Sequence, residues 1–271
     1  VQVARRSLKV MAGTFVLTVS LILCMVFVPK KNALDTLQKR ETKAKETGKM
    51  TEEQLAKQKA NGSESDDTIC TADLTDDEIL EGLNLLLIGD SIAVDVTDDF
   101  YEMFPNSVSD TKIGRITSLG KQVLDSYIDE KKWEGEGVIF ASLSNSPING
   151  ELEDIREKIG KDMPLFLTTV RIPHETFEEE SNSKIKKFVE ENDHTYLIDW
   201  YAASEGHDEY FDADDTHLLP AGAKAYAKCI KEAVLAAYKK ENIEIPKSRL
   251  VSSTDTSTDS SNDSSTNAST E

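Results

Sequence analysis

Four short apolar runs between residues 83 and 200 constrain the fold of this chain more than any other feature. They are Leu83–Gly89, Gly137–Leu143, Pro164–Val170 and Thr195–Trp200. Each run is apolar at consecutive positions rather than at alternate ones, which is typical of strands that are buried on both faces. A weaker strand is expected at Val108–Ile113.

Helical patterns separate these strands along the chain. They cover about Val94–Met103, Ser118–Lys132, Leu152–Lys161, Phe177–Asn192 and Ala221–Lys240. Repeated alternation of strand and helix predicts a parallel sheet with helices on both faces. We therefore expect an α/β domain over residues 76–245, with a flavodoxin-like, three-layer α/β/α fold around five parallel strands. The Thr75–Glu78 segment predicts a capped short helix at the entrance to this domain.

The segments outside this domain differ from it in composition. Val10–Val28 is uncharged and apolar, would span about 28 Å as a helix, and lacks a small-residue cleavage site after it. We expect a retained transmembrane helix there, with residues 1–9 as its cytoplasmic flank. Residues 29–75 are polar and charged, without an apolar face wide enough to bury, and are predicted to be a linker or stalk. The Ser/Thr/Asp-rich residues 246–271 are expected to be disordered.

Two features of the N-terminal region bear on what precedes it. Basic residues lie on both sides of the apolar run, so charge alone does not fix the orientation of the span. The chain begins with Val1 rather than Met, which is expected of a piece of a longer protein with further membrane segments upstream.

Charge and cysteine content exclude several classes of function. The formal net charge of −19 argues against nucleic-acid binding, which requires basic surface. No Cys or His spacing indicates zinc, and the acidic run at residues 208–215 lacks the glycine and the final glutamate of an EF-hand. No metal and no other cofactor is therefore expected. Cys70 and Cys229 could form a disulfide outside the cytoplasm or remain two separate thiols.

Polar residues follow each expected strand, at the edge where an open α/β sheet binds ligands. In chain order they are Gly89-Asp90-Ser91, Gly114-Arg115, Ser144-Asn145-Ser146, Arg171-Ile172-Pro173 and, after a loop, Asp214-Asp215-Thr216-His217. Because the carboxyl ends of parallel strands meet at one edge, we expect these groups to converge there.

Their residue types fit nucleophilic catalysis by a serine. The Ser91 hydroxyl needs a base to remove its proton, and the imidazole of His217 can act as that base. Asp214, three residues earlier, can fix the orientation of the imidazole. The backbone N–H groups of Ser91 and Gly114 and the side-chain amide of Asn145 could stabilise the oxyanion, each by about 3 kcal/mol.

Each motif also has an ordinary structural interpretation. Gly-Asp-Ser after a strand suits a strand-to-helix turn, Asn145 suits a turn, and Asp-x-x-His often arises by chance. Their arrangement at successive strand ends favours catalysis over these separate interpretations. His174, His194 and His207 are expected to be surface or loop residues.

The same residues resemble the motifs of the SGNH hydrolase superfamily. Gly89-Asp90-Ser91 resembles its first block, Gly114 its second, Asn145 its third and Asp214-x-x-His217 its last. The segments IGDSIAVD, IGR, FASLSNSP, VRIP, LIDWYAAS and DDTHLLPAGAKAY are similar to the C-terminal extracytoplasmic domain of bacterial peptidoglycan O-acetyltransferases. This resemblance extends over most of Leu83–Tyr238.

The resemblance implies a function at the cell surface. In such proteins a multi-span acyltransferase-3 membrane domain, here upstream in the same protein or in a separate chain, would deliver acetyl groups outward. The SGNH domain would transfer them to the C6 hydroxyl of N-acetylmuramic acid in peptidoglycan, or to another surface glycan. The resemblance therefore implies localisation at the cell membrane, with the catalytic domain on the extracytoplasmic side.

One position departs from the family pattern. Ser146 stands where the family usually has glycine after the third-block Asn145, so a Cβ there could tilt the loop that aims the amide. Arg171 occupies an Arg-x-Pro position similar to the family's and is interpreted as a structural or substrate-loop residue.

Three functions remain open at this point. The first is an acetyltransferase that acts through an acyl-serine, and the second is a carbohydrate acetylesterase with the same triad and water as acceptor. The third is a non-catalytic domain that binds surface glycans. The predicted membrane span favours transfer, since a donor supplied through the membrane requires proximity.

Overall fold

The computed structural model describes residues 38–58 and 67–250. The predicted transmembrane segment Val10–Val28, its flank at residues 1–9 and residues 251–271 of the expected tail lie outside this range. Within the part of the chain that is described, no helix is long and apolar enough to cross a membrane.

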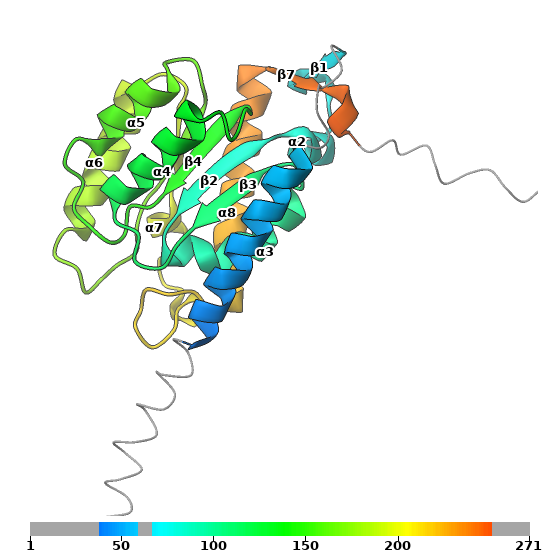
Figure 1. Ribbon diagram of the computed structural model, residues 1–271. Helices are drawn as coiled ribbons and strands as arrows, with labels where there is room; N and C mark the ends of the chain where they lie inside the picture. The colour runs from blue at the N-terminus through cyan, green and yellow to red at the C-terminus, as the bar shows by residue number, and fades with distance from the viewer. Residues whose placement is uncertain (1–37, 59–66, 251–271) are drawn as a thin grey trace, which may run out of the picture.

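A five-stranded parallel sheet forms the centre of the fold (Figure 1). Its strands are β2 (Leu85–Gly89), β3 (Val108–Thr111), β4 (Gly137–Ala141), β5 (Leu165–Thr168) and β6 (Thr195–Ile198). They are ordered β3-β2-β4-β5-β6, and every neighbouring pair is parallel. This is the flavodoxin-like order, so the predicted fold class is confirmed for the described residues.

Helices cover both faces of the sheet. The long ones are α3 (Ser91–Met103), α4 (Thr117–Asp129), α5 (Glu151–Ile159), α6 (Glu178–Glu191) and α8 (Pro220–Glu241). Alternate residues of β2 enter different cores: Leu85 and Leu87 pack with α3 and α8, whereas Leu86 and Ile88 pack with α4, α5 and α6. A strand between two cores has no polar side, which explains its continuous apolar sequence.

The ordered domain extends beyond residues 76–245 at both ends. The short helix α2 (Asp76–Gly82) begins with the predicted capping box between Thr75 and Glu78. Before α2, strand β1 (Thr68–Cys70) pairs antiparallel with β7 (Glu244–Pro246). A 3-10 turn at Lys247–Arg249 follows β7. The expected disordered tail therefore does not begin at residue 246. Elsewhere, short turns η1 (Thr71–Asp73), α7 (Trp200–Ala203) and η2 (Asp208–Tyr210) complete the described elements.

The two cysteines of the described region do not form a disulfide. Cys70 in β1 and Cys229 in α8 are separate, partly buried thiols. Burial raises the pKa of the Cys229 thiol, and the Glu232 carboxylate adds to this rise.

Residues 38–58 form a helix that packs on the domain, whereas a stalk was expected there. We call it the N-terminal helix. Its inward-facing positions recur every three or four residues, and Thr47 and Thr51 are buried. Thr51 Oγ1 donates to Ser109 O at 2.5 Å, and Gln54 Nε2 donates to Pro105 O at 2.6 Å. A wide apolar face is not required because, apart from Leu55, which packs against one of the two cores, the helix docks through polar side chains that reach backbone carbonyl groups.

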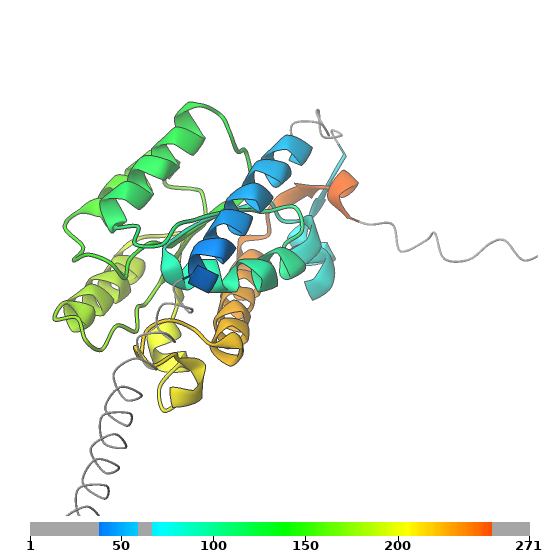
Figure 2. The same ribbon diagram turned by 60° about the horizontal axis from the view of Figure 1, so that its bottom comes forward.

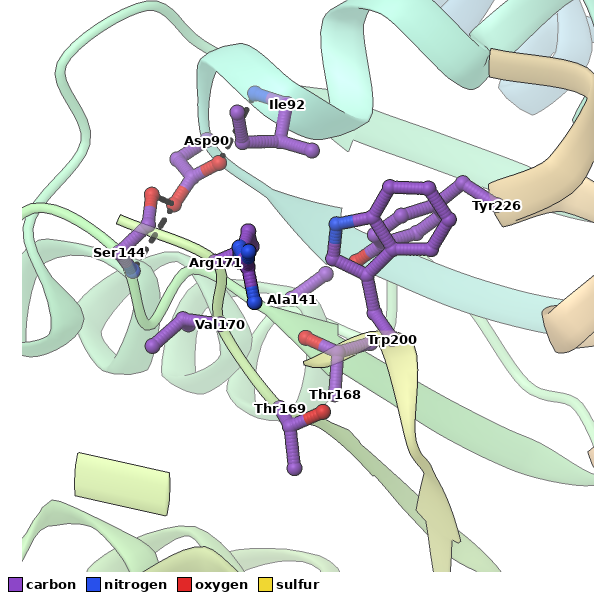
Figure 3. A pocket seen from close by; sticks show the side chains of 10 residues that line it. All are labelled: Asp90, Ile92, Ala141, Ser144, Thr168, Thr169, Val170, Arg171, Trp200 and Tyr226. Atoms are coloured by element: carbon purple, nitrogen blue, oxygen red, sulfur yellow. Dashed lines mark hydrogen bonds between the residues drawn. The ribbon is translucent and has the colours of Figure 1, made fainter. Parts of the chain in front are cut away.

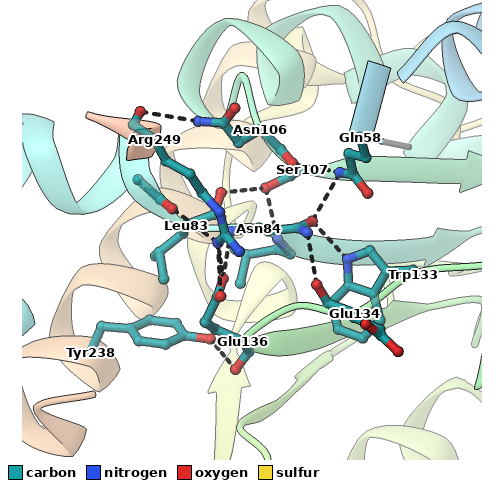
Figure 4. Close-up of polar contacts among 12 residues, drawn as sticks. Gln58, Leu83, Asn84, Asn106, Ser107, Trp133, Glu134, Glu136, Tyr238 and Arg249 are labelled. Atoms are coloured by element: carbon teal, nitrogen blue, oxygen red, sulfur yellow. Dashed lines mark hydrogen bonds and ion pairs between the residues drawn. The ribbon is translucent and has the colours of Figure 1, made fainter. Parts of the chain in front are cut away.

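Polar side chains tie the amino-terminal edge of the sheet together (Figure 4). Asn84 lies at the centre: its Oδ1 accepts hydrogen bonds from Trp133 Nε1 at 2.7 Å and from Gln58 Nε2 of the N-terminal helix at 3.2 Å. Its backbone N–H donates to Glu136 Oε2 at 2.7 Å, and that carboxylate also binds Arg249. This edge is thus filled by structural contacts, and the opposite edge is left for ligands.

Candidate active site

The first predicted motif forms the turn from β2 to α3. β2 ends at Gly89, Asp90 caps the helix by accepting from Ile92 N at 3.0 Å, and Ser91 is the first helical residue. A Cβ on Gly89 would lie 2.1 Å from the Cβ of Ala93, so the close packing of strand and helix requires glycine there. Ser91 therefore stands at the positive end of the helix dipole, which favours negative charge on its oxygen.

Asp90 has a role that the sequence did not reveal. Its fully buried carboxylate accepts the Ser144 backbone N–H at 3.1 Å and makes a short hydrogen bond with the Ser144 hydroxyl. Burial raises the pKa of Asp90, and the hydrogen bonds from Ser144 and Ile92 oppose that rise. Asp90 thereby fixes the third loop, which carries Asn145, next to Ser91. An aspartate at a helix N-cap was the available signal.

Asp214 and His217 form the predicted pair. The imidazole Nδ1 of His217 lies 2.7 Å from Asp214 Oδ2, while Asp214 Oδ1 accepts the backbone N–H groups of His217 at 2.9 Å and Thr216 at 3.2 Å. Partial burial opposes ionisation of Asp214, but these hydrogen bonds outweigh it and lower the pKa of the carboxyl. With Nδ1 directed at Asp214, Nε2 is the ring nitrogen left to exchange a proton with a hydroxyl group.

This loop is bound to the helix that begins with Ser91. Leu218 N, directly after His217, donates to Asp95 Oδ2 at 3.2 Å, and Asp95 lies one turn after Ser91 in α3. Burial raises the pKa of Asp95, and the hydrogen bond from Leu218 and the charge of nearby Arg40 oppose this rise. Asp95, a second residue that the motifs did not indicate, thus ties the loop of the Asp214–His217 pair to α3 one turn after Ser91. Ser91 itself is buried, and among the described residues no hydrogen bond joins its hydroxyl to His217.

The second predicted block divides into an exposed glycine and a buried arginine. Gly114 has a φ of +69°, in the left-handed region that glycine adopts at no cost, and it is exposed at the carboxyl end of β3. Arg115 is buried: its Nη1 donates to Gly89 O at 3.1 Å and its Nη2 pairs with Asp110 at 2.6 Å. Arg115 holds the ends of β2 and β3 together and is not available to a substrate.

The third block is fixed through Ser146. Thr117 N, the first backbone N–H of α4, donates to Ser146 Oγ at 3.2 Å, so this side chain supplies a cap that α4 otherwise lacks. The adjacent Asn145 is exposed, and its amide donates to Ser144 Oγ at 3.3 Å. The residue that departs from the family pattern therefore secures the loop to the helix that follows Gly114.

A small pocket lies between the β2–α3 turn and the third block, at the carboxyl ends of β2, β4 and β5 (Figure 3). Its lining residues are Asp90, Ile92, Ala141, Ser144, Thr168, Thr169, Val170, Arg171, Trp200 and Tyr226. The rings of Trp200 and Tyr226 form an apolar wall (Figure 3). The Arg171 guanidinium lies 5.1 Å from the centre of the Tyr201 ring, so a cation–π contact holds it at the pocket.

The other three histidines lie at the surface, as expected. His174 Nε2 pairs with Asp215 at 3.1 Å, His194 with Glu241 at 2.7 Å, and His207 stacks on Tyr210. Over residues 38–58 and 67–250, no group of three His, Cys, Asp or Glu side chains is placed to hold a metal ion.

Comparison with known proteins relates this chain to O-acetyltransferases. No family model matches the chain. Over 146 residues it is 33% identical to the O-acetyltransferase OatA of Staphylococcus aureus strain NCTC 8325, a match that covers 54% of this chain and 24% of that protein. OatA of strain MRSA252 matches with the same identity and coverage.

A solved structure has the same fold. It is the C-terminal catalytic domain of peptidoglycan O-acetyltransferase A (OatA) from Streptococcus pneumoniae with a methylsulfonyl adduct; the TM-score is 0.54 at 20% identity, covering 61% of this chain and 99% of that domain. The chain spans about a quarter of the length of the curated relatives that it matches. Over the 146 matched residues it is homologous to the staphylococcal O-acetyltransferases. Its α/β fold is that of the streptococcal catalytic domain.

Proposed function

We propose that this chain is the catalytic part of a membrane-anchored, extracytoplasmic O-acetyltransferase. It would move an acetyl group through an acyl-Ser91 intermediate to a hydroxyl group of a cell-wall glycan, the C6 hydroxyl of N-acetylmuramic acid in peptidoglycan. The observation that carries the proposal is the Asp214–His217 pair at 2.7 Å, bound through Asp95 to the helix that Ser91 begins.

In the first half-reaction the Ser91 hydroxyl oxygen attacks the carbonyl carbon of the acetyl donor. His217 Nε2 accepts the hydroxyl proton, and Asp214 stabilises the resulting imidazolium. The oxyanion lies near the N–H groups of Ser91 and Gly114 and the Asn145 amide, which would turn from Ser144 to bind it. The intermediate collapses, and the leaving group of the donor departs with the proton from His217.

In the second half-reaction the glycan hydroxyl attacks the carbonyl carbon of the acetyl-serine. His217 Nε2 accepts the proton of that hydroxyl, and collapse of the tetrahedral intermediate returns a proton to the Ser91 oxygen. The products are the acetylated sugar and the free serine. The same cycle with water as acceptor releases acetate instead.

Two observations support transfer. The curated relatives that the chain matches at 30% and 33% identity include O-acetyltransferases and putative O-acetyltransferases. In addition, the first described residues of the N-terminal helix lie beside the loop of Asp214, and only residues 29–37 separate them from the predicted span. Nine residues reach at most about 30 Å when fully extended. The site would therefore stay near the membrane, where a multi-span acyltransferase-3 partner would deliver the acetyl group.

Hydrolysis is the second candidate, and the openness of the site favours it. Asp214 is 46% exposed and His217 23%, while Gly114 and Asn145 are also exposed, so water can reach the residues around Ser91, which itself is buried. A non-catalytic glycan-binding domain has less support, because the hydrogen bond of Ser146 to Thr117 accounts for the one irregular position.

The nucleophile is tested with the full chain and a small activated acetyl ester. Wild type is expected to release acetate, and Ser91→Ala and His217→Ala are expected to abolish release while they keep the native circular dichroism spectrum. Ser183→Ala, at an exposed position of α6, is the matched control and should retain full activity. Turnover by folded Ser91→Ala at the wild-type rate would refute the mechanism.

A covalent label gives a readout that is independent of turnover. The streptococcal domain carries a methylsulfonyl adduct, and we expect methanesulfonyl fluoride to sulfonylate Ser91 here, with loss of fluoride. Peptide mass spectrometry should find the adduct on Ser91 in wild type and much less of it in His217→Ala. Labelling elsewhere with Ser91 unmodified would contradict its role as nucleophile.

The acceptor distinguishes transfer from hydrolysis. With an acetyl donor and muropeptides or chitooligosaccharides, transfer predicts an O-acetylated sugar whose yield rises with acceptor concentration as free acetate falls. Formation of acetate alone at every acceptor concentration would favour the esterase.

A further inference from the structure

The N-terminal helix approaches the candidate site with one cation. Arg40, in its first described turn, places Nη2 2.9 Å from Asp212 Oδ2 and Nη1 3.6 Å from Asp214 Oδ2. Its side chain is only 17% exposed. Figure 1 shows the start of this helix beside the loop that precedes α8. One guanidinium thus bridges two carboxylates of the loop that carries His217.

Asp212 is the residue that closes this loop. Its backbone N–H donates to His217 O at 2.8 Å, and its carbonyl accepts Asp215 N at 2.9 Å. Its side chain also accepts Ala213 N at 2.7 Å. A bond from Arg40 to Asp212 therefore restrains the turn that places Asp214 opposite the imidazole.

A second cation of the same helix contacts the other support of the loop. Lys43, three residues after Arg40 and on the same face, donates to Asp95 O at 3.0 Å and pairs with Asp98 at 3.3 Å. Asp95 is the residue whose carboxylate binds Leu218 N. Figure 2 shows the dark-blue end of the helix crossing α3. The N-terminal helix therefore contacts both Asp212 and Asp95, the two residues that hold the Asp214–His217 pair in place.

We infer that Arg40 is a positioning residue of the acyl-transfer site, which fixes the Asp212–His217 loop and holds Asp214 toward the imidazole. This inference rests on the proposed function. It assigns residues 38–58 to the catalytic unit, because without them Asp212 and Asp214 would lose this cationic partner.

Charge also favours this arrangement. Asp90, Asp95 and Asp214 all exert an attraction on the His217 imidazolium. Asp212 adds a further carboxylate close to Asp214, and Arg40 lies between these two. Without it, the two carboxylates would repel each other and the loop would open toward solvent. A guanidinium fork suits two separate oxygen atoms better than a single ammonium.

The inference is tested in the full chain with Arg40→Gln, Arg40→Lys and Asp214→Asn. Arg40→Gln is expected to lower kcat for a small acetyl ester about tenfold, with little change in KM, because small misplacements of a reacting group are costly. Arg40→Lys should recover part of the loss, since an ammonium still reaches Asp212. In an Asp214→Asn background, removal of Arg40 should cost far less than tenfold, because both changes act on the same carboxylate.

Two controls separate positioning from general stabilisation. Lys45→Gln removes an exposed cation from the same helix and should leave kcat unchanged. Thr51→Val removes the buried hydrogen bond to Ser109 and should lower the urea midpoint without the loss in kcat that Arg40→Gln causes.

Hydrogen exchange gives a readout that does not depend on activity. Peptides that cover residues 208–219 should exchange faster in Arg40→Gln than in wild type, because the Asp212 and His217 amides lose their protection. Equal exchange in the two proteins, or an equal loss of kcat with and without Asp214, would overturn the inference. Absence of Ser91-dependent turnover in wild type would refute the proposed function instead, and exchange would still decide the role of Arg40.

Discussion

Replacement of Asp214 by asparagine alters one atom of the candidate triad and leaves its shape intact. Asp214 Oδ1 accepts two backbone N–H groups, from Thr216 and His217, whereas Oδ2 has one hydrogen-bond partner, the imidazole Nδ1 at 2.7 Å, with Arg40 Nη1 farther away at 3.6 Å. The single oxygen of asparagine is best placed where two donors point. Its NH₂ group then faces His217 Nδ1 and donates to it, which forces the ring proton onto Nε2. In that tautomer Nε2 cannot accept the proton of Ser91.

The size of the effect follows from burial. In serine proteases with a buried triad, the same change lowers kcat about 10⁴-fold, or about 5.4 kcal/mol. Here Asp214 is 46% exposed, so water partly replaces the carboxylate and the alternative tautomer is less strongly fixed. We expect kcat of Asp214→Asn to fall about 10³-fold, or about 4 kcal/mol, with KM nearly unchanged.

The assay is turnover of a small acetyl ester by the full chain, with Asp215→Asn as the control. Asp215 is the next residue of the same loop, pairs with His174 at the surface, and has a φ of +55° that asparagine also accepts readily. We expect Asp215→Asn to retain wild-type kcat. A folded Asp214→Asn protein within threefold of wild type would refute the role given to the Asp214–His217 hydrogen bond.

Two further predictions concern packing and acid stability. Gly89→Ala places a Cβ 2.1 Å from the Cβ of Ala93, so α3 must shift. We expect the free energy of unfolding in urea to fall by about 1–3 kcal/mol and kcat to fall with it. Gly48→Ala, which has open space around it, should lower neither quantity. Equal midpoints for the two variants would contradict the packing argument. The Asp214 carboxyl has a folded-state pKa below its ordinary value of 3.8, so it stabilises the fold above that pH, and the stabilisation is lost as pH falls through the folded-state pKa. The urea midpoint of wild type should therefore exceed that of Asp214→Asn at about pH 6, and the difference should shrink toward about pH 3; a difference that grows on acidification would contradict this sign.

Local sequence patterns determined the fold class and the location of the candidate site. Continuous apolar runs predicted strands of a sheet covered on both faces, and the helical patterns between them favoured parallel order. Three of these runs form the central strands β2, β4 and β5, whereas the fourth forms the edge strand β6. Ser91 and Asn145 follow two of these strands and Gly114 follows the weaker strand β3, so their position at one edge of the sheet was a consequence of topology. Asp214 and His217 are three residues apart, and their hydrogen bond is local.

The tertiary structure decided what holds these residues in place. Asp90 binds the third loop, Asp95 binds the residue after His217, and Arg40 bridges Asp212 and Asp214 across a separation of more than 170 residues. No local pattern encodes such contacts, because each partner is an ordinary surface charge until the chain folds. The N-terminal helix was interpreted as a stalk for the same reason: it docks through threonine, glutamine, lysine and arginine, and hydropathy does not register a face that is buried by hydrogen bonds.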